Sequence, residues 1–121
     1  MGAHIKKATQ IKSVGNKPKI INEFIGLVNS GSSDVSIARM QSPSGWIEPA
    51  QTPDFDEYTL VLKGEVHACT NDETFIVKPG EAFIAKRAEK VQYSTPGPDG
   101  AEYVAVCLPA FSPGTVHREE D

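Results

Sequence analysis

The sequence predicts an all-β protein that folds as an antiparallel jelly-roll barrel, and two observations support this fold class. Short apolar runs recur about every eight to twelve residues with turn residues between them, as in β-sandwiches and β-barrels. The connections are often too short for parallel crossovers, which favours antiparallel pairing. We count about eight or nine such strands and hardly a helix, and closing them into a barrel removes exposed strand edges.

The start of the chain is the least regular part. Residues 1–19 are polar and contain several lysines, which predicts an arm that either adds an edge strand or wraps a partner subunit. The apolar residues of 20–28 satisfy neither the helical nor the strand period cleanly, so this stretch forms a strand or a short helix. Residues 35–40 alternate as a half-buried strand does.

A loop-rich segment and then a clear pair of strands follow. Residues 46–56 contain Pro49 and Pro53, which lack the amide hydrogen that a central strand donates, so we expect a loop here. A run of β-branched and aromatic residues begins at Glu57 and stops at Gly64. The pattern resumes after the glycine, as in two strands joined by a tight turn.

Four further strands complete the predicted barrel. They cover residues 74–77, 82–85, 91–95 and 103–108. The last of them is apolar on both faces, as a central strand packed on two sides would be. We therefore assign residues 20–112 to the barrel and residues 113–121 to a polar C-terminal tail.

Length and charge limit the functions to be considered. The chain has 121 residues, about one domain, and a formal net charge of -4, which argues against nucleic acid as a partner. It contains no apolar run of the roughly 18 residues that span a membrane and no secretory signal, so we expect a cytoplasmic protein without a membrane partner. Cys69 and Cys107 lie in apolar runs and are expected to be buried free thiols.

The spacing of several residues resembles the cupins, small jelly-roll barrels whose first motif reads G-x5-H-x-H-x3-E-x6-G. This frame fits at Gly45, Gln51, Pro53, Glu57 and Gly64. The second cupin motif, G-x5-P-x-G-x2-H-x3-N, begins at Gly80 and then falls on Lys86, Ala88, Val91 and Thr95. The chain is similar to a histidine-poor bacterial subgroup that partly matches the cupin half of ethanolamine-utilisation proteins, and the resemblance implies a cupin-type barrel.

The resemblance also bears on cofactors and partners. In metal-binding cupins, three histidines and a glutamate hold a divalent ion such as manganese, iron, nickel or zinc. The matching positions here are Gln51, Pro53, Glu57 and Val91, which leaves Gln51 and Glu57 as the only candidate metal ligands. Because such metals favour imidazole, the resemblance implies at most a weakly held divalent metal ion. It also implies a homodimer, to which the arm of residues 1–19 could contribute.

Glu57 is the candidate catalytic residue. Strand alternation places it on the inward face with Thr59 and Val61. A carboxylate there needs a hydrogen bond, an ion pair or a cation, and burial would raise its pKa toward an acid–base role. A purely structural hydrogen bond is the alternative. Tyr93 shares an inward face with Val91, so its hydroxyl either serves a ligand or Glu57, or belongs to a core tyrosine.

Two further residues are candidate ligand-binding groups. Gln51 offers its amide to a ligand or caps the loop backbone. His117 lies in the tail and reaches a ligand only if the tail folds back over the barrel mouth, while an exposed surface histidine is the alternative.

The sequence leaves two functions open. In the first, the barrel binds a polar small molecule and Glu57, with Gln51 and Tyr93, performs acid–base chemistry on it, with or without a weakly held metal. In the second, the barrel is a non-catalytic sensing or dimerisation module without metal. A fold by itself does not decide between them, so the sequence leaves open whether the protein is an enzyme.

Overall fold

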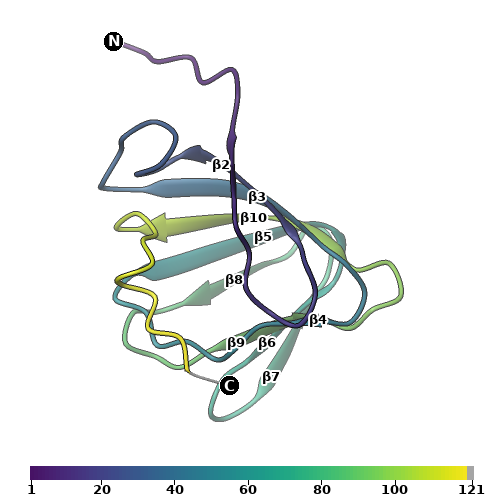
Figure 1. Ribbon diagram of the computed structural model, residues 1–121. Helices are drawn as coiled ribbons and strands as arrows, with labels where there is room; N and C mark the ends of the chain where they lie inside the picture. Colours follow the sequence, from purple (N-terminus) through teal and green to yellow (C-terminus); the bar gives the residue numbers. More distant parts are fainter. Residues whose placement is uncertain (120–121) are drawn as a thin grey trace.

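Two antiparallel sheets face each other in the computed structural model, which describes residues 1–119 (Figure 1). The strands are β1 (Thr9–Ile11), β2 (Ile20–Ile25), β3 (Ser36–Ser42), β4 (Trp46–Ile47), β5 (Asp56–Gly64), β6 (Val66–Cys69), β7 (Thr74–Val77), β8 (Ala82–Ala85), β9 (Gln92–Thr95) and β10 (Ala101–Leu108). No helix occurs among the described residues. Accordingly, this part of the chain offers no helical segment with the length and apolar character to span a membrane.

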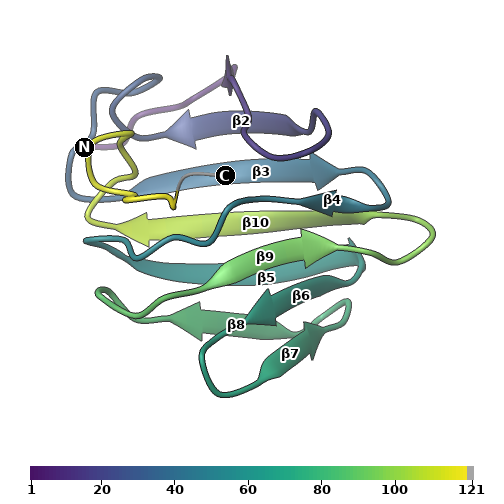
Figure 2. The same cartoon turned by 60° about the horizontal axis from the view of Figure 1, so that its bottom comes forward.

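The strand order is that of a jelly roll. One sheet has the order β1-β2-β3-β10-β5-β8, and the other has the order β4-β9-β6-β7. Figure 2 shows the smaller sheet lying over the larger one. Each pair of neighbouring strands is antiparallel. The predicted all-β, antiparallel jelly-roll fold is therefore confirmed.

Side-chain alternation along β5 follows the sequence pattern. Glu57, Thr59 and Val61 are buried, whereas Tyr58 is half-buried and Leu60 is exposed. Successive side chains of a strand point to opposite faces, so the three buried residues share the face that turns toward the second sheet. The predicted inward direction of Glu57 is thus confirmed.

The apolar core lies between the two sheets. Its members include Trp46, Val61, Val66, Tyr93 and Tyr103. Trp46 and Val61 are at most 1% exposed, and burying a side chain of this kind contributes roughly 1.5–3 kcal/mol to stability. A second, smaller cluster consists of Phe55, Cys107 and Val116, with Phe111 packed against it.

The two cysteines differ in burial. Cys107 is buried, as expected, but Cys69 is exposed, so the expectation of a buried thiol is wrong for Cys69. The reason is strand alternation: Val66 and Ala68 point inward from β6, which leaves Cys69 on the outer face.

The first twenty-odd residues are tied to both sheets. Residues 20–25 form a strand, one of the two forms expected for 20–28, and a register shift between Glu23 and Ile25 explains why their apolar pattern is irregular. Ahead of them, β1 pairs with β2 at the edge of the larger sheet. The indole nitrogen of Trp46 donates to the carbonyl oxygen of Val14 at 3.1 Å, which attaches the same segment to the smaller sheet. In Figure 1 this purple segment runs down from the level of β2 to β4.

The C-terminal residues also return to the barrel. Backbone amides of Thr52 and Asp54 donate to the carbonyl oxygens of His117 and Thr115 at 3.2 and 2.9 Å. Val116 is only 3% exposed. The arm from β1 onward and the described part of the tail therefore both pack on the barrel, and only residues 120–121 of the tail lie outside the described part.

Candidate functional site

A cavity of about 360 Å³ opens between the sheets. Most of its wall is apolar. Six polar or charged side chains stand out on it: Lys19, Glu48, Gln51, Glu57, Tyr93 and Arg118. A small, mostly apolar cavity with a few convergent polar groups is the usual form of a small-molecule site.

Glu57 is the titratable group at the centre of this site. Its side chain is buried, and the amide nitrogen of Gln51 donates to its Oε1 at 3.4 Å. Burial raises the pKa of Glu57 to about 7, and the negative charge of Glu48 adds to the rise. Lys19 acts in the opposite direction because its positive charge favours the carboxylate. At neutral pH this group can therefore both give and take a proton.

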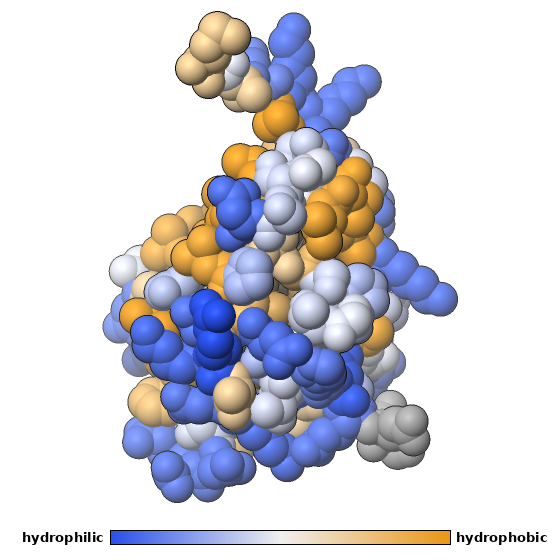
Figure 3. Space-filling model, turned by 90° about the vertical axis from the view of Figure 1, so that its left-hand side faces the viewer, coloured by the Kyte–Doolittle hydropathy of each residue, from blue (hydrophilic) through white to orange (hydrophobic). Residues whose placement is uncertain are grey.

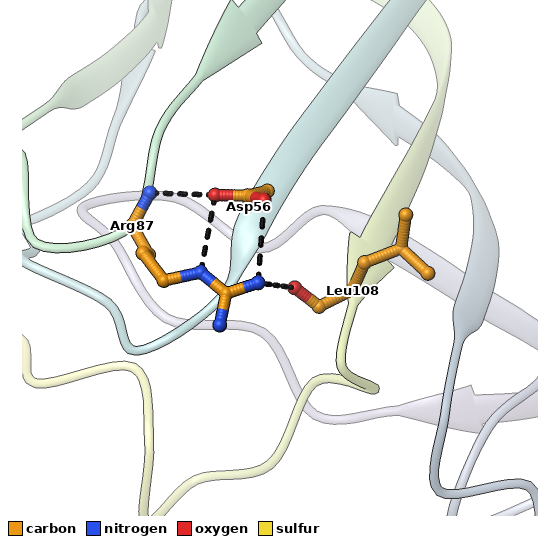
Figure 4. A network of polar contacts seen from close by, with 3 residues as sticks. All are labelled: Asp56, Arg87 and Leu108. Atoms are coloured by element: carbon orange, nitrogen blue, oxygen red, sulfur yellow. Dashed lines mark hydrogen bonds and ion pairs between the residues drawn. The ribbon is translucent and has the colours of Figure 1, made fainter.

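The start of β5 is held in place next to Glu57. The carboxylate of Asp56 accepts hydrogen bonds from the backbone amide of Arg87 at 2.9 Å and from its guanidinium at 3.3 Å (Figure 4). The same guanidinium donates to the carbonyl oxygen of Leu108 at 3.2 Å. The hydrogen bonds from Arg87 lower the pKa of Asp56. Arg87 thus joins the chain after β8 to the start of β5 and the end of β10.

Glu48 is a second acid in the cavity that sequence reasoning did not single out. It follows β4, is 6% exposed, and its Oε2 has no hydrogen-bond partner within residues 1–119. Burial raises its pKa, while the charges of Lys19 and Arg118 oppose the rise. The signal that could have found it is alternation, because Trp46 and Glu48 are buried while Ile47 is exposed.

Two cations come from the ends of the chain. The Lys19 ammonium lies 3.2 Å from the Tyr103 hydroxyl and 3.9 Å from the centre of the Trp46 ring. Burial lowers the pKa of Lys19, and the negative charges of Glu48 and Glu57 counteract this. Arg118 lies with its guanidinium carbon 5.7 Å from the Phe111 ring centre. Sequence reasoning missed both, since neither belongs to a motif and each reaches the cavity only through the fold.

Tyr93 points inward, as strand alternation predicted. It is 6% exposed, and within the described chain its hydroxyl has no partner at hydrogen-bond distance. The hydroxyl is nonetheless close enough to Glu57 to lower the pKa of that carboxyl. Burial raises the pKa of Tyr93 itself, and the nearby charge of Glu57 adds to this. Tyr93 is therefore a neutral hydroxyl that can donate either to Glu57 or to a ligand in the cavity.

His117 lies outside the cavity. Although the tail does fold back, its imidazole Nε2 lies 2.6 Å from the Asp54 carboxylate, and both side chains are more than half exposed. The neighbouring residue, Arg118, lines the cavity instead. The structure thus does not bring His117 to the ligand-binding position expected for it, because its imidazole pairs with Asp54 at the exposed surface instead.

The donor set of the cavity does not fit a divalent metal ion. Of the four positions that hold metal in cupins, Gln51 and Glu57 come together, but Pro53 and Val91 have no donor atom in their side chains. No group of three or more His, Cys, Asp or Glu side chains within residues 1–119 could hold a metal. The cations Lys19 and Arg118 act on Glu57, where a metal would have to bind.

Comparison with known proteins places the fold. No family model matches the chain. A protein from Myxococcus xanthus named endoribonuclease YbeY is 39% identical over 101 residues, which cover 84% of this chain but 34% of that protein. The chain thus spans about a third of the length of this relative.

Solved structures match over more of their length. EutQ from Clostridium difficile has a TM-score of 0.63 and 20% identity, and the match covers 78% of this chain and 65% of EutQ. The polyketide cyclase RemF from Streptomyces resistomycificus has a TM-score of 0.76 and 17% identity, and covers all of this chain and 86% of RemF. The chain thus shares its fold with EutQ and RemF, in agreement with the cupin-type jelly roll that the sequence resemblance implied.

Proposed function

We propose that the barrel binds a polar small molecule and that Glu57 acts on it as a general acid and base. The observation that carries the proposal is that the buried Glu57 carboxyl shares one cavity with the Gln51 amide and with a Tyr93 hydroxyl that lacks a partner in the described structure. Buried polar groups of this kind call for a bound partner, since leaving them unpaired costs stability.

Each of the three side chains has a distinct role in this proposal. Gln51 donates its amide to Glu57 and so orients the carboxyl toward the cavity. Glu57 removes or delivers a proton, and its pKa of about 7 supports this task because both forms are then populated near neutral pH. Tyr93 donates its hydroxyl to an oxygen of the ligand as negative charge develops there. No step in this proposal involves a metal ion.

The test is proton exchange in heavy water. Wild-type protein and the Glu57→Gln variant are incubated with a panel of small keto and hydroxy acids, and deuterium incorporation at carbon is followed by NMR. We expect exchange with at least one compound for the wild type and a loss of about a hundredfold or more in Glu57→Gln, since general acid–base groups contribute this much. Glu89→Gln is the matched control, because Glu89 is an exposed carboxylate outside the cavity. Unchanged exchange in a folded Glu57→Gln variant overturns the proposal.

A second candidate function is a non-catalytic binding module that works beside another domain or a second copy. The apolar walls of the cavity favour it, and so does the relative from Myxococcus xanthus, in which the matching segment is one third of a longer protein. Figure 3 shows apolar surface gathered in the upper part of one face, where such a partner could bind, above a hydrophilic lower part. Sedimentation analysis of the purified chain checks for a second copy, and a ligand that binds without turnover would favour this function over the first.

A further inference from the structure

We propose that Lys19 and Arg118 form the anion-binding half of the cavity and that the ligand is a small carboxylate with an apolar, ring-sized body. The inference rests on the proposed function in one respect, that a small molecule occupies the cavity. It adds the chemical class of that molecule and two residues that recognise it.

Lys19 has hydrogen-bonding capacity to spare. Its ammonium carries three N–H donors, of which one meets the Tyr103 hydroxyl at 3.2 Å and another the Met40 sulfur, a weak acceptor, at 3.5 Å. The Tyr103 hydroxyl is itself held by Ser42 at 2.8 Å, so this arrangement fixes the ammonium in place. Lys19 takes part in none of the ion pairs of the described chain.

The side chain of Arg118 has an unused hydrogen-bond donor in the same cavity. Its Nε is buried and has no hydrogen-bond partner in residues 1–119. The guanidinium lies near the Phe111 ring, which supports it but accepts no ordinary hydrogen bond. A planar guanidinium with a free donor matches a carboxylate in shape and in charge.

The balance of charge favours an anion. Lys12 and Glu23 also line the cavity, so its wall carries three basic and three acidic side chains, and burial raises the pKa values of two of the acids, Glu48 and Glu57. Burial thus disfavours the charged forms of these two acids, whereas the arginine stays charged. A ligand carboxylate would compensate the charge of Arg118 and favour the charged form of Lys19, whose pKa burial lowers, and a proton held by Glu57 would remain free for the ligand.

The rest of the cavity wall determines the size and the apolar character of the ligand beyond its carboxylate. Trp46, Phe55 and Phe111 present ring surfaces to the cavity, and Ile21 and Ala105 add aliphatic surface. A cavity of about 360 Å³ lies at the small end of the range for ligand sites. One ring with a carboxylate suits both the volume and the apolar surface.

Trp46 provides the readout for a direct test. It is the one tryptophan of the sequence, and the Lys19 ammonium lies 3.9 Å from its ring centre, so its fluorescence reports on this part of the cavity. Benzoate and benzamide serve as a matched pair of probes, since they share a ring and differ in charge. We expect benzoate to bind the wild type about tenfold or more tightly than benzamide, as a charge-assisted hydrogen bond implies.

Substitutions of Lys19 and Arg118 test whether positive charge causes the preference for benzoate over benzamide. Lys19→Met should remove most of the preference for benzoate, whereas Lys19→Arg should keep it. Lys17→Met is the matched control on the same segment, because its ammonium is exposed and donates to the Ser44 carbonyl oxygen outside the cavity. Arg118→Met should weaken benzoate binding without weakening benzamide binding.

Several outcomes would overturn the inference. They are equal affinity of the wild type for the two probes, no fluorescence response to benzoate, or an unchanged preference in folded Lys19→Met and Arg118→Met variants. These results do not depend on proton exchange by Glu57. A failure of anion binding with intact exchange would leave the proposed acid–base function standing, and the reverse result would leave the anion site standing.

Discussion

Glu48 and Glu57 approach one cavity from opposite sheets, and the charge of Glu48 raises the pKa of Glu57. Glu48 follows β4 of the smaller sheet, whereas Glu57 lies on β5 of the larger one. Two acids that share a site rarely ionise together, because each charge disfavours the other. The negative charge of Glu48 therefore helps Glu57 to hold a proton near neutral pH.

This coupling predicts the effect of neutralising Glu48. In Glu48→Gln the pKa of Glu57 should fall below about 7, since one cause of its rise is removed while burial remains. NMR titration of carbon-13-labelled glutamate side chains measures the shift. Glu89→Gln, which changes an exposed carboxylate, should leave the pKa of Glu57 in place, and an unchanged pKa in Glu48→Gln would contradict the coupling.

Burial of Glu57 also predicts how stability depends on pH. The folded pKa, about 7, lies above the reference value of 4.5, so the folded state holds the proton more tightly than the unfolded state. The stabilisation is therefore complete below about pH 4.5 and is lost as the pH rises to about 7, by roughly 3 kcal/mol for a shift of this size.

The comparison with Glu57→Gln isolates this contribution from those of Glu48, Lys19 and Arg118, which act on the same carboxyl. Urea unfolding at a series of pH values gives the free energy of unfolding for both proteins. The difference between them should change across the window from pH 4.5 to 7 and stay flat above it. A difference that is constant with pH would show that Glu57 titrates normally in the folded protein.

Adding a side chain at Gly64, in the turn between β5 and β6, should destabilise the protein. It has φ 68°, and an added Cβ would collide with the carbonyl oxygen of Gly100. Gly31 is the matched control because its φ is 76° and nothing lies within 4 Å of an added Cβ. Both Gly→Ala changes should cost about 1 kcal/mol for the left-handed backbone, and Gly64→Ala should cost clearly more. Equal losses in urea unfolding would show that the turn relaxes without strain.

The hydrogen bonds of the Asn16 side chain should hold the N-terminal segment against the smaller sheet. Its side chain donates to the Gly45 carbonyl oxygen at 2.9 Å and accepts from the Ile47 amide at 2.8 Å, next to Trp46. Asn16→Ala removes both bonds, so the segment should open more often and acrylamide should quench Trp46 fluorescence more strongly. Asn71→Ala, in an exposed turn, is the control. Equal quenching in the two variants would show that other contacts hold the segment.

The sequence alone predicted the parts of this protein that depend on local periodicity. Alternation along β5 placed Glu57 inward, and the same rule placed Tyr93, because a strand sends successive side chains to opposite faces. Turn residues such as Gly64 divided the strands, and the motif frame around Gly45 and Gly80 led to the cupin fold. Each of these signals lies within a few residues of the chain.

Only the tertiary structure decided which groups meet in the cavity. Lys19 reaches it because the segment before β2 runs between the edges of the two sheets, and Arg118 reaches it because the tail returns to the chain near Gln51. Glu48 alternates with the exposed Ile47, but only the packing of the two sheets shows that its buried side opens into the cavity. Their charges become important only after burial removes water and brings them near Glu57, and long-range strand register produces that environment.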